Sequence, residues 1–372
     1  MLFIPHKHLY ISGTSYVSAD EPDYKEVITD ANSRRRMGRL LKMAVWCGLK
    51  SLDGVPSERV AGIITSTGAG FMKDTISFGS SIFDREETLL NPSPFMQSTF
   101  NTASGYIALI RKIHAYNTTY VQQADGFAAS LVDAAMLLDD ACEGNVALVG
   151  AFDEVTPEVD VIRQRLGLYR VGDGFLPLGE GAAAFLLSAA MPTDVSESCR
   201  AAESSTERGG DDGSESGSGQ SGDEAGSESA SERGGDANSE CSTGPLRESE
   251  SASEHGGESG SESSSEPLHE YGGTSSRSLN GTKDGNAALR FCGLANLSDL
   301  PKCAENPISE LFGINACVNV ISCADHVEFL GAFRSLLPVL LCKLISEQQI
   351  PDGYTAIVDD VNEDGVIVLL HK

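Results

Sequence analysis

The stretch QADGFAASLVDAAMLL, residues 123–138, indicates the fold more clearly than any other part of the sequence. From Phe127 to its end it is apolar around nearly the whole circumference of a helix, with Asp133 as the one charge. A helix of this kind is buried centrally, because a surface helix keeps a polar face. We therefore expect a buried helix over residues 127–141, with free backbone N–H groups and the positive dipole end facing the preceding loop. In an α/β enzyme, such a loop holds a nucleophile or an anion.

Short apolar runs around this helix are typical of buried strands. Residues 60–66 (VAGIITS) and 146–151 (VALVGA) end in small residues, and residues 181–187 (GAAAFLL) have the same character. Helices are expected over residues 34–49 and 103–114. Strands and helices thus alternate, which predicts an α/β fold with a mixed or parallel sheet between helical layers.

The last part of the sequence has a shorter pattern of the same type. Strand-like runs cover residues 316–322, 354–359 and 366–370, and an apolar helix is expected near residues 330–346. So few elements bury little apolar surface on their own. We expect them to pack onto the first part of the chain.

An acidic, low-complexity segment separates these two parts. Between residues 201 and 270 the sequence holds 18 Asp and Glu, 19 Ser and 13 Gly, and it lacks Val, Ile, Phe, Met, Trp and Tyr. Such a segment cannot bury enough apolar surface to offset its chain entropy, so disorder is expected. The sequence therefore divides into a domain at residues 1–190, an acidic linker at 191–287 and a shortened domain at 288–372.

Charge and cysteine content argue against several functional classes. Lys and Arg total 27 against 54 Asp and Glu, and the formal net charge of -27 opposes binding to nucleic acid or to an anionic membrane. The nine Cys include no CxxC pair, so we expect reduced thiols in the cytoplasm rather than disulfides or a zinc site. No apolar run reaches the roughly 20 residues of a membrane helix, and no signal peptide is recognised at the start. We expect no metal and no cofactor.

Several motifs follow one another in a characteristic order. They are PFMQSTFNT at 94–102, NTTYV at 117–121, the buried helix after Gly126, VGAFDE at 149–154 and LGEGAAA at 178–184. This order is similar to the N-terminal half of β-ketoacyl-acyl-carrier-protein synthases, in particular to short synthase-like proteins of bacterial aryl-polyene and flexirubin-type pigment clusters. The resemblance runs through most of residues 34–188. It implies a thiolase-like fold of α-β-α-β-α layers with a shortened C-terminal half, and a dimer built through the strand at 117–121.

The family's chemistry needs a Cys at the N-terminus of the buried helix. The helix dipole and the free N–H groups there lower the thiol pKa and hold the thiolate that takes the acyl chain. Ser130 lies a turn inside the helix and Cys142 at its far end, so neither is a geometric substitute. The resemblance places the nucleophile position at one of four residues, none of them Cys: Ala124, Asp125, Gly126 or Phe127.

The family's other catalytic motifs are also absent or altered in this sequence. Ketoacyl synthases supply one His from a His-Gly-Thr motif, which has no counterpart in the expected region. A second His follows a Lys as Lys-x-x-x-Gly-His; the sequence ISCADH at 321–326 retains His326 but has Ile and Asp at the Lys and Gly positions. The family's Gly-Phe-Gly-Gly loop, which lends an oxyanion-hole donor, corresponds to NEDG at 362–365. Removing one such donor costs about 10²–10³ in rate, so normal condensation is not expected.

The resemblance leaves three roles open. Residues 123–126, QADG, are similar to the Gln-Ala-Gly-Gly with which chain-length factors replace the Cys, and such factors are inactive partners that help wall the acyl tunnel of a competent synthase. This favours a non-condensing partner in fatty-acid or polyene-type biosynthesis, which binds acyl carrier protein and either a complete ketoacyl synthase or a second copy of itself. The alternatives are a binding module for acyl carrier protein and a carrier-protein-dependent acyltransferase or decarboxylase that uses His326 with Gln123 or Asp125. Whether the chain is an enzyme stays open at this point.

Simpler structural roles compete for the same residues. A carboxylate at a helix N-terminus is a good cap, which is the interpretation we favour for Asp125. His326 could equally cap or satisfy the start of a helix. The run Gly68-Ala69-Gly70 after the first expected strand is read as a turn rather than a phosphate cradle, because the GxGxxG pattern is incomplete.

Overall fold

The computed structural model describes residues 1–18, 20–85, 87–168, 170–171, 174–175, 179–191, 288–327, 334–361 and 365–372. The expected disordered linker at 191–287 lies outside the described residues, except for residue 191 itself. The chain divides into two units, one of residues 1–208 with 271–372 and one of residues 209–270, and the second is wholly outside the described part. The N-terminal half below means residues 1–191, and the C-terminal half means residues 288–372.

Five strands form the sheet of the N-terminal half, in the order β2-β8-β5-β3-β4. Strand β3 is parallel to β4 and β5, whereas β8 is antiparallel to β5 and β2. The expected strands at 60–66, 117–121, 146–151 and 181–187 are all confirmed, and β2 was not foreseen. The bounds are β2 (Leu9–Val17), β3 (Val60–Thr67), β4 (Tyr116–Val121), β5 (Val146–Asp153) and β8 (Gly181–Ser188).

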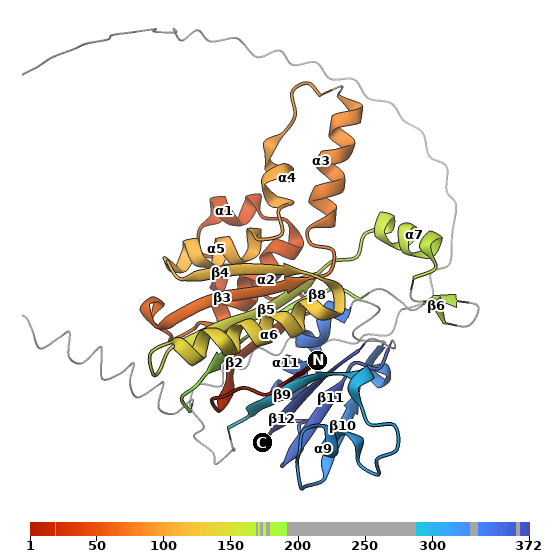
Figure 1. Ribbon diagram of the computed structural model, residues 1–372. Coiled ribbons are helices and arrows are strands. Elements are labelled where there is room, and N and C mark those ends of the chain that lie inside the picture. Colours follow the sequence, from red (N-terminus) through yellow and green to blue (C-terminus); the bar gives the residue numbers. More distant parts are fainter. Residues whose placement is uncertain are drawn as a thin grey trace, which may run out of the picture. The chain divides into compact units, whose positions relative to one another are not determined.

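Helices cover both faces of this sheet, as Figure 1 shows for α5 and α6 on opposite sides. On one face lie α2 (Arg39–Ser51) and α5 (Thr102–Arg111), and on the other lie α6 (Gln123–Asp140) and α11 (Leu337–Ser346). Strand β8 is apolar on both sides: its even-numbered residues 182–186 pack in the α2 cluster and its odd-numbered residues 183–187 in the α6 cluster. Successive side chains of a strand point to opposite faces, and both faces of β8 are buried. Every residue of GAAAFLL is therefore apolar.

Two expected helices end or break where the backbone departs from helical geometry. The helix expected over 34–49 is two helices, α1 (Ala31–Arg36) and α2, because Met37 and Gly38 are both extended. Helix α5 stops at Arg111 because Lys112 adopts the left-handed conformation, with φ 55°. Helix α6 starts at Gln123, four residues before the predicted start.

The C-terminal half repeats the pairing pattern of the N-terminal half. Its order is β10-β11-β12-β9, in which β12 is antiparallel to both neighbours and β10 is parallel to β11. Among the described residues, no strand corresponds to β4, so β10 is left at the edge. The pairs Leu9↔Phe291 and Tyr10↔Arg290 join β2 to β9 and unite both halves in one 10-stranded sheet. The bounds are β9 (Arg290–Asn296), β10 (Val318–Ser322), β11 (Tyr354–Val358) and β12 (Val366–His371), and β1 (Leu2–Phe3) pairs with β9.

Three apolar clusters separate five layers. The first lies between α2, α5 and the N-terminal sheet, and the second surrounds α6 and α11 between the two halves of the sheet. The third packs α9 (Pro307–Leu311) against the outer face of β9, β11 and β12. The α-β-α-β-α layers implied by the resemblance are therefore present, with a C-terminal half shortened by one strand in the described part.

The remaining elements lie around this framework. Helices α3 and α4 form a pair beyond the end of β3, and no residue of α3 is buried. Among the described helices, none combines the length and apolarity that crossing a bilayer requires. The bounds are α3 (Met72–Asp84), α4 (Pro92–Gln97), α7 (Pro157–Leu166), β6 (Arg170–Val171) and β7 (Gly174–Phe175), with 3-10 helices η1 (Tyr24–Glu26), η2 (Ser57–Arg59), η3 (Leu297–Asp299), η4 (Cys323–His326) and η5 (Arg334–Leu336).

A buried carboxylate at the end of β5 ties the two halves together. Asp153 is 0% exposed and accepts hydrogen bonds from Thr67 Oγ1 at 2.9 Å, Gly68 N at 2.9 Å and Ala69 N at 2.8 Å. Ser335 Oγ of η5 makes a further, short hydrogen bond to Asp153 Oδ2. Burial raises the pKa of Asp153, and the hydrogen bonds from these groups lower it in part.

We predict that Asp153→Ala destabilises the fold by about 3 kcal/mol, because it leaves buried donors from the loop after β3 unpaired at about 1–3 kcal/mol each. Ser335→Ala removes one of these hydrogen bonds and should cost only about 1 kcal/mol. Urea unfolding measures both, with exposed Asp84→Ala as the matched control, which should stay within about 0.5 kcal/mol of wild type. An Asp153→Ala protein as stable as that control would show that the carboxylate does not hold the halves.

Candidate functional site

The first turn of α6 is the place where the family's nucleophile is expected. Gln122 is the N-cap residue, with extended backbone and no side-chain capping bond, so the interpretation of Asp125 as the cap is wrong in position. Asp125 instead lies exposed in the first helical turn. There its carboxylate interacts favourably with the positive end of the helix dipole. The side chains of Gln123 and Ala124 lie outside the described part of the structure.

The other two candidate positions are part of the packing of α6. Gly126 is buried and close to the sheet: a Cβ there would lie 3.5 Å from both Ser66 Cβ and Tyr120 O. Phe127 is 0% exposed and its ring meets Phe185 edge-on, with centroids 6.3 Å apart. Phe127 therefore belongs to the core.

No thiol is available at this turn. Helix α6 contains no Cys, and Cys142 is exposed beyond its last residue. Cys47 and Cys342 are buried elsewhere, and burial raises the pKa of both thiols, which suppresses the reactive thiolate. Ser130 is fully buried and donates to Phe127 O at 2.7 Å, so its hydroxyl is committed within the helix.

His326 ends the 3-10 helix η4 at the edge strand β10. Asp360 fixes this turn, because its carboxylate contacts Ser322 Oγ at 2.6 Å and accepts from Ala324 N at 2.9 Å. In the part of the chain that the structure describes, no hydrogen bond or ion pair links His326 to Asp125. Residues 362–364 of the NEDG stretch lie outside the described residues.

The loop after β3 is closed to an anion. Asp153 takes the amides of Gly68 and Ala69, which a phosphate cradle would have to offer to its ligand. Gly70 has φ 71°, and a Cβ there would come within 2.5 Å of the Phe100 ring. The interpretation of this run as a turn is therefore confirmed. Sequence reasoning missed the role of Asp153, although an Asp directly after a fully apolar strand was the available signal.

Strand β4 lies at the edge of the sheet, and no other described strand pairs with its outer side. A cavity of about 590 Å³ lies along it, lined by residues 98–101, 117–119 and Val121. Large apolar side chains are exposed on β4 and on the segment from α4 to α5: Phe95 (55%), Met96 (66%), Phe100 (44%), Tyr116 (45%) and Val121 (41%). Unpaired strand edges flanked by apolar side chains are sites of association.

Comparisons with known proteins agree with this fold. The ishigamide ketosynthase/chain length factor matches with a TM-score of 0.56 and 13% identity, covering 98% of both chains. A type II polyketide acyl carrier protein in complex with its ketosynthase, AntDE:AntF, gives 0.56 and 13%, covering 98% of this chain and 99% of that one. A β-ketoacyl synthase from Burkholderia phymatum STM815 gives 0.55 and 10%, covering 98% of each. A comparison with curated proteins finds no match.

The family assignment comes from the sequence itself. The model of the β-ketoacyl synthase N-terminal domain matches residues 14–220, more than half of the 372 residues, and includes α6 and every strand of the N-terminal sheet except the first residues of β2. The chain belongs to the β-ketoacyl synthase family.

Proposed function

We propose that this chain is a non-condensing, chain-length-factor-like partner of an active ketoacyl synthase in fatty-acid or polyene-type biosynthesis. The observation that carries the proposal is an intact buried helix α6 whose first turn lacks the family's Cys. The scaffold that positions a nucleophile has been kept without the nucleophile. Such a protein is expected to act by binding rather than by covalent chemistry.

The C-terminal half supports the same role. It has four strands, β9 to β12, aligned as in the N-terminal half but without a counterpart of β4 in the described part. The sequence also lacks the His-Gly-Thr motif, and Ile321 stands where the family has a Lys. Loss of one oxyanion donor lowers the rate of catalysis by about 10²–10³. Loss of several donors and bases together is expected to lower the rate further.

The edge strand β4 is the proposed dimer contact. The family pairs this strand across a two-fold axis, and here its edge is unpaired and flanked by the exposed apolar side chains of the α4–α5 segment. A synthase seated on β4 would extend the sheet and cover the cavity along residues 117–121. Acyl carrier protein is the second proposed partner. It would bring its acyl chain to the active synthase of the heterodimer.

An acyltransferase or decarboxylase that uses His326 with Gln123 or Asp125 is the less supported alternative. It needs His326 near the first turn of α6, and no interaction in the described residues brings His326 to Asp125. Transfer of an acyl group onto the isolated chain would be needed to favour it.

We predict that incubation with an acyl-carrier thioester leaves no acyl group on residues 123–127, because no thiolate is present to attack the thioester. Intact-mass spectrometry followed by peptide mapping reads this directly. Exposed Cys142 can react with small alkylating reagents, so only carrier-dependent transfer counts. Acylation anywhere in the first turn of α6 would overturn the non-condensing assignment.

We further predict that Val121→Lys prevents association with a Cys-bearing synthase, since a charge on the covered edge of β4 must be desolvated in the complex. Val320→Lys is the matched control, because Val320 is 57% exposed on the opposite edge strand, β10. Sedimentation velocity of each mixture gives the result. Equal association of both variants, or a monomeric wild type in the presence of the synthase, would exclude β4 as the contact.

A further inference from the structure

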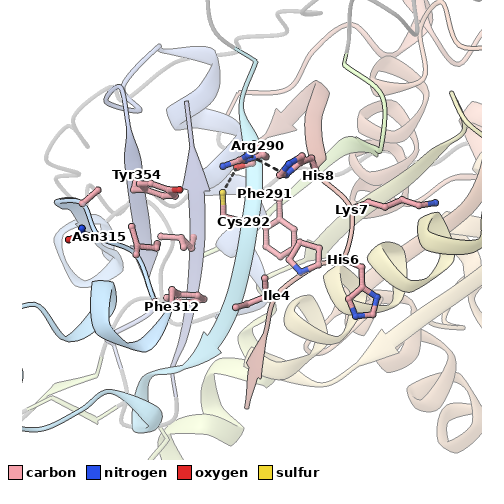
Figure 2. Close-up of a pocket in the computed structure, with 15 residues that line it drawn as sticks. Ile4, His6, Lys7, His8, Arg290, Phe291, Cys292, Phe312, Asn315 and Tyr354 are labelled. Carbon is pink, nitrogen blue, oxygen red and sulfur yellow. Dashed lines mark hydrogen bonds between the residues drawn. The ribbon is translucent and has the colours of Figure 1, made fainter.

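A cavity of about 440 Å³ lies on the C-terminal half of the protein. Figure 2 shows it between the extended segment of residues 4–8 and the side chains of Phe312, Asn315 and Tyr354. Cys292 and Leu369 of the sheet also line it. A volume of this size falls within the range of small-molecule sites.

This cavity is separate from the first turn of α6. Lys7, next to the cavity, donates from Nζ to Leu138 O at 3.0 Å and to Asp139 O at 2.5 Å, in the last turn of α6. Leu138 and Asp139 follow the helix start at Gln123 by 15 and 16 residues, which is about 23 Å at about 1.5 Å per residue. A ligand here would not reach the vacant nucleophile position.

The cavity exists because the outer face of the C-terminal sheet is only partly covered. In the N-terminal half the outer face lies under α2, of 13 residues, and α5, of 10 residues. In the C-terminal half the corresponding helix is α9, with five residues; Ile308 of α9 and its C-cap residue Phe312 pack against the sheet. Beside α9, the end of this sheet at Arg290, Cys292 and Tyr354 stays partly exposed.

One cation faces this opening without a carboxylate partner. Arg290 begins β9 and donates from Nη1 to His8 Nδ1 at 3.2 Å, as the dashed line in Figure 2 marks. A guanidinium only donates, so His8 Nδ1 accepts and the neutral ring carries its proton on Nε2. None of the lining residues is acidic, and no carboxylate in the described part of the chain pairs with Arg290.

The two other basic residues of the rim are already engaged. His6 Nδ1 lies 3.2 Å from Asp139 Oδ2, and Lys7 binds the carbonyls at the end of α6. The positive charge left for a ligand is therefore that of Arg290. The chain has a formal charge of -27, so a cavity lining that contains an arginine and no acidic residue differs from its overall acidic composition.

We propose that this cavity binds an amphipathic monocarboxylate. The carboxylate accepts two N–H bonds from the Arg290 guanidinium, whose planar fork suits a carboxylate, and the His8 Nε2 proton is a further donor beside it. The apolar part of the ligand lies against Phe312 and Leu369 in place of water. The site does not depend on the partner role proposed for α6 and β4.

The test is calorimetric titration of the full chain with decanoate, decanol and inorganic phosphate. We expect decanoate to bind, and Arg290→Gln to weaken it about tenfold through loss of the charge-assisted pair. Arg59→Gln is the matched control, because Arg59 is a part-exposed arginine outside the cavity that donates to Glu143 O at 3.0 Å, and its loss should leave affinity unchanged. Decanol should bind more weakly than decanoate and equally to wild type and Arg290→Gln.

A second variant tests the apolar part of the site. Cys292→Phe fills space at the sheet surface of the cavity and should abolish decanoate binding, with circular dichroism showing that each variant is folded. The proposal is overturned if Arg290→Gln binds decanoate as wild type does, or if millimolar decanoate gives no heat. It is equally overturned if inorganic phosphate binds as tightly as decanoate, because the site would then select a free anion.

Discussion

The structure depends on one buried carboxylate. Asp153 ends the central strand β5, and it accepts hydrogen bonds from the loop after β3 and from Ser335 of the C-terminal half. Without it, the buried hydroxyls of Thr67 and Ser335 and the part-buried amides of Gly68 and Ala69 would lose their acceptor at the junction of β3, β5 and η5. The same junction faces α6, which packs on β3, β5 and η5. These contacts hold α6 against the sheet in a chain whose α6 contains no Cys.

The first turn of α6 holds no Cys, and apolar side chains are exposed along an edge of the sheet. The C-terminal half has one strand fewer than the N-terminal half in the described residues and covers its outer face with five-residue α9. Because of the missing strand, β10 lies at the edge of the sheet. Because α9 is short, a cavity remains beside Arg290. On the opposite edge of the sheet, β4 remains unpaired among exposed aromatic and aliphatic side chains. The uncovered edge at β4 and the cavity beside Arg290 are therefore the surfaces on which the proposed binding roles depend.

Much of the fold could be predicted from sequence because its central elements are buried on both sides. β5 and β8 are continuous apolar runs, and α6 is apolar all round, so their patterns do not depend on distant partners. β2 was missed because LYISGTSYV mixes polar and apolar residues and is paired by strands from both halves. The start of α6 was placed too late because Gly126 is typical of a loop, whereas it lies buried inside the first turns of the helix, against β3 and β4. The Asp153 junction and the Arg290 cavity join residues more than 180 positions apart, which no local pattern reveals.

The central claim is that this chain assists condensation without performing it. The most direct measurement is formation of carrier-bound β-ketoacyl product by a Cys-bearing ketoacyl synthase that associates with this chain. The synthase is assayed alone, with this chain, and with this chain after replacing the synthase's Cys by Ala. The account predicts product that increases when this chain is added and that disappears entirely with the Cys→Ala synthase. Product formed by this chain alone, or with the Cys→Ala synthase, would contradict it.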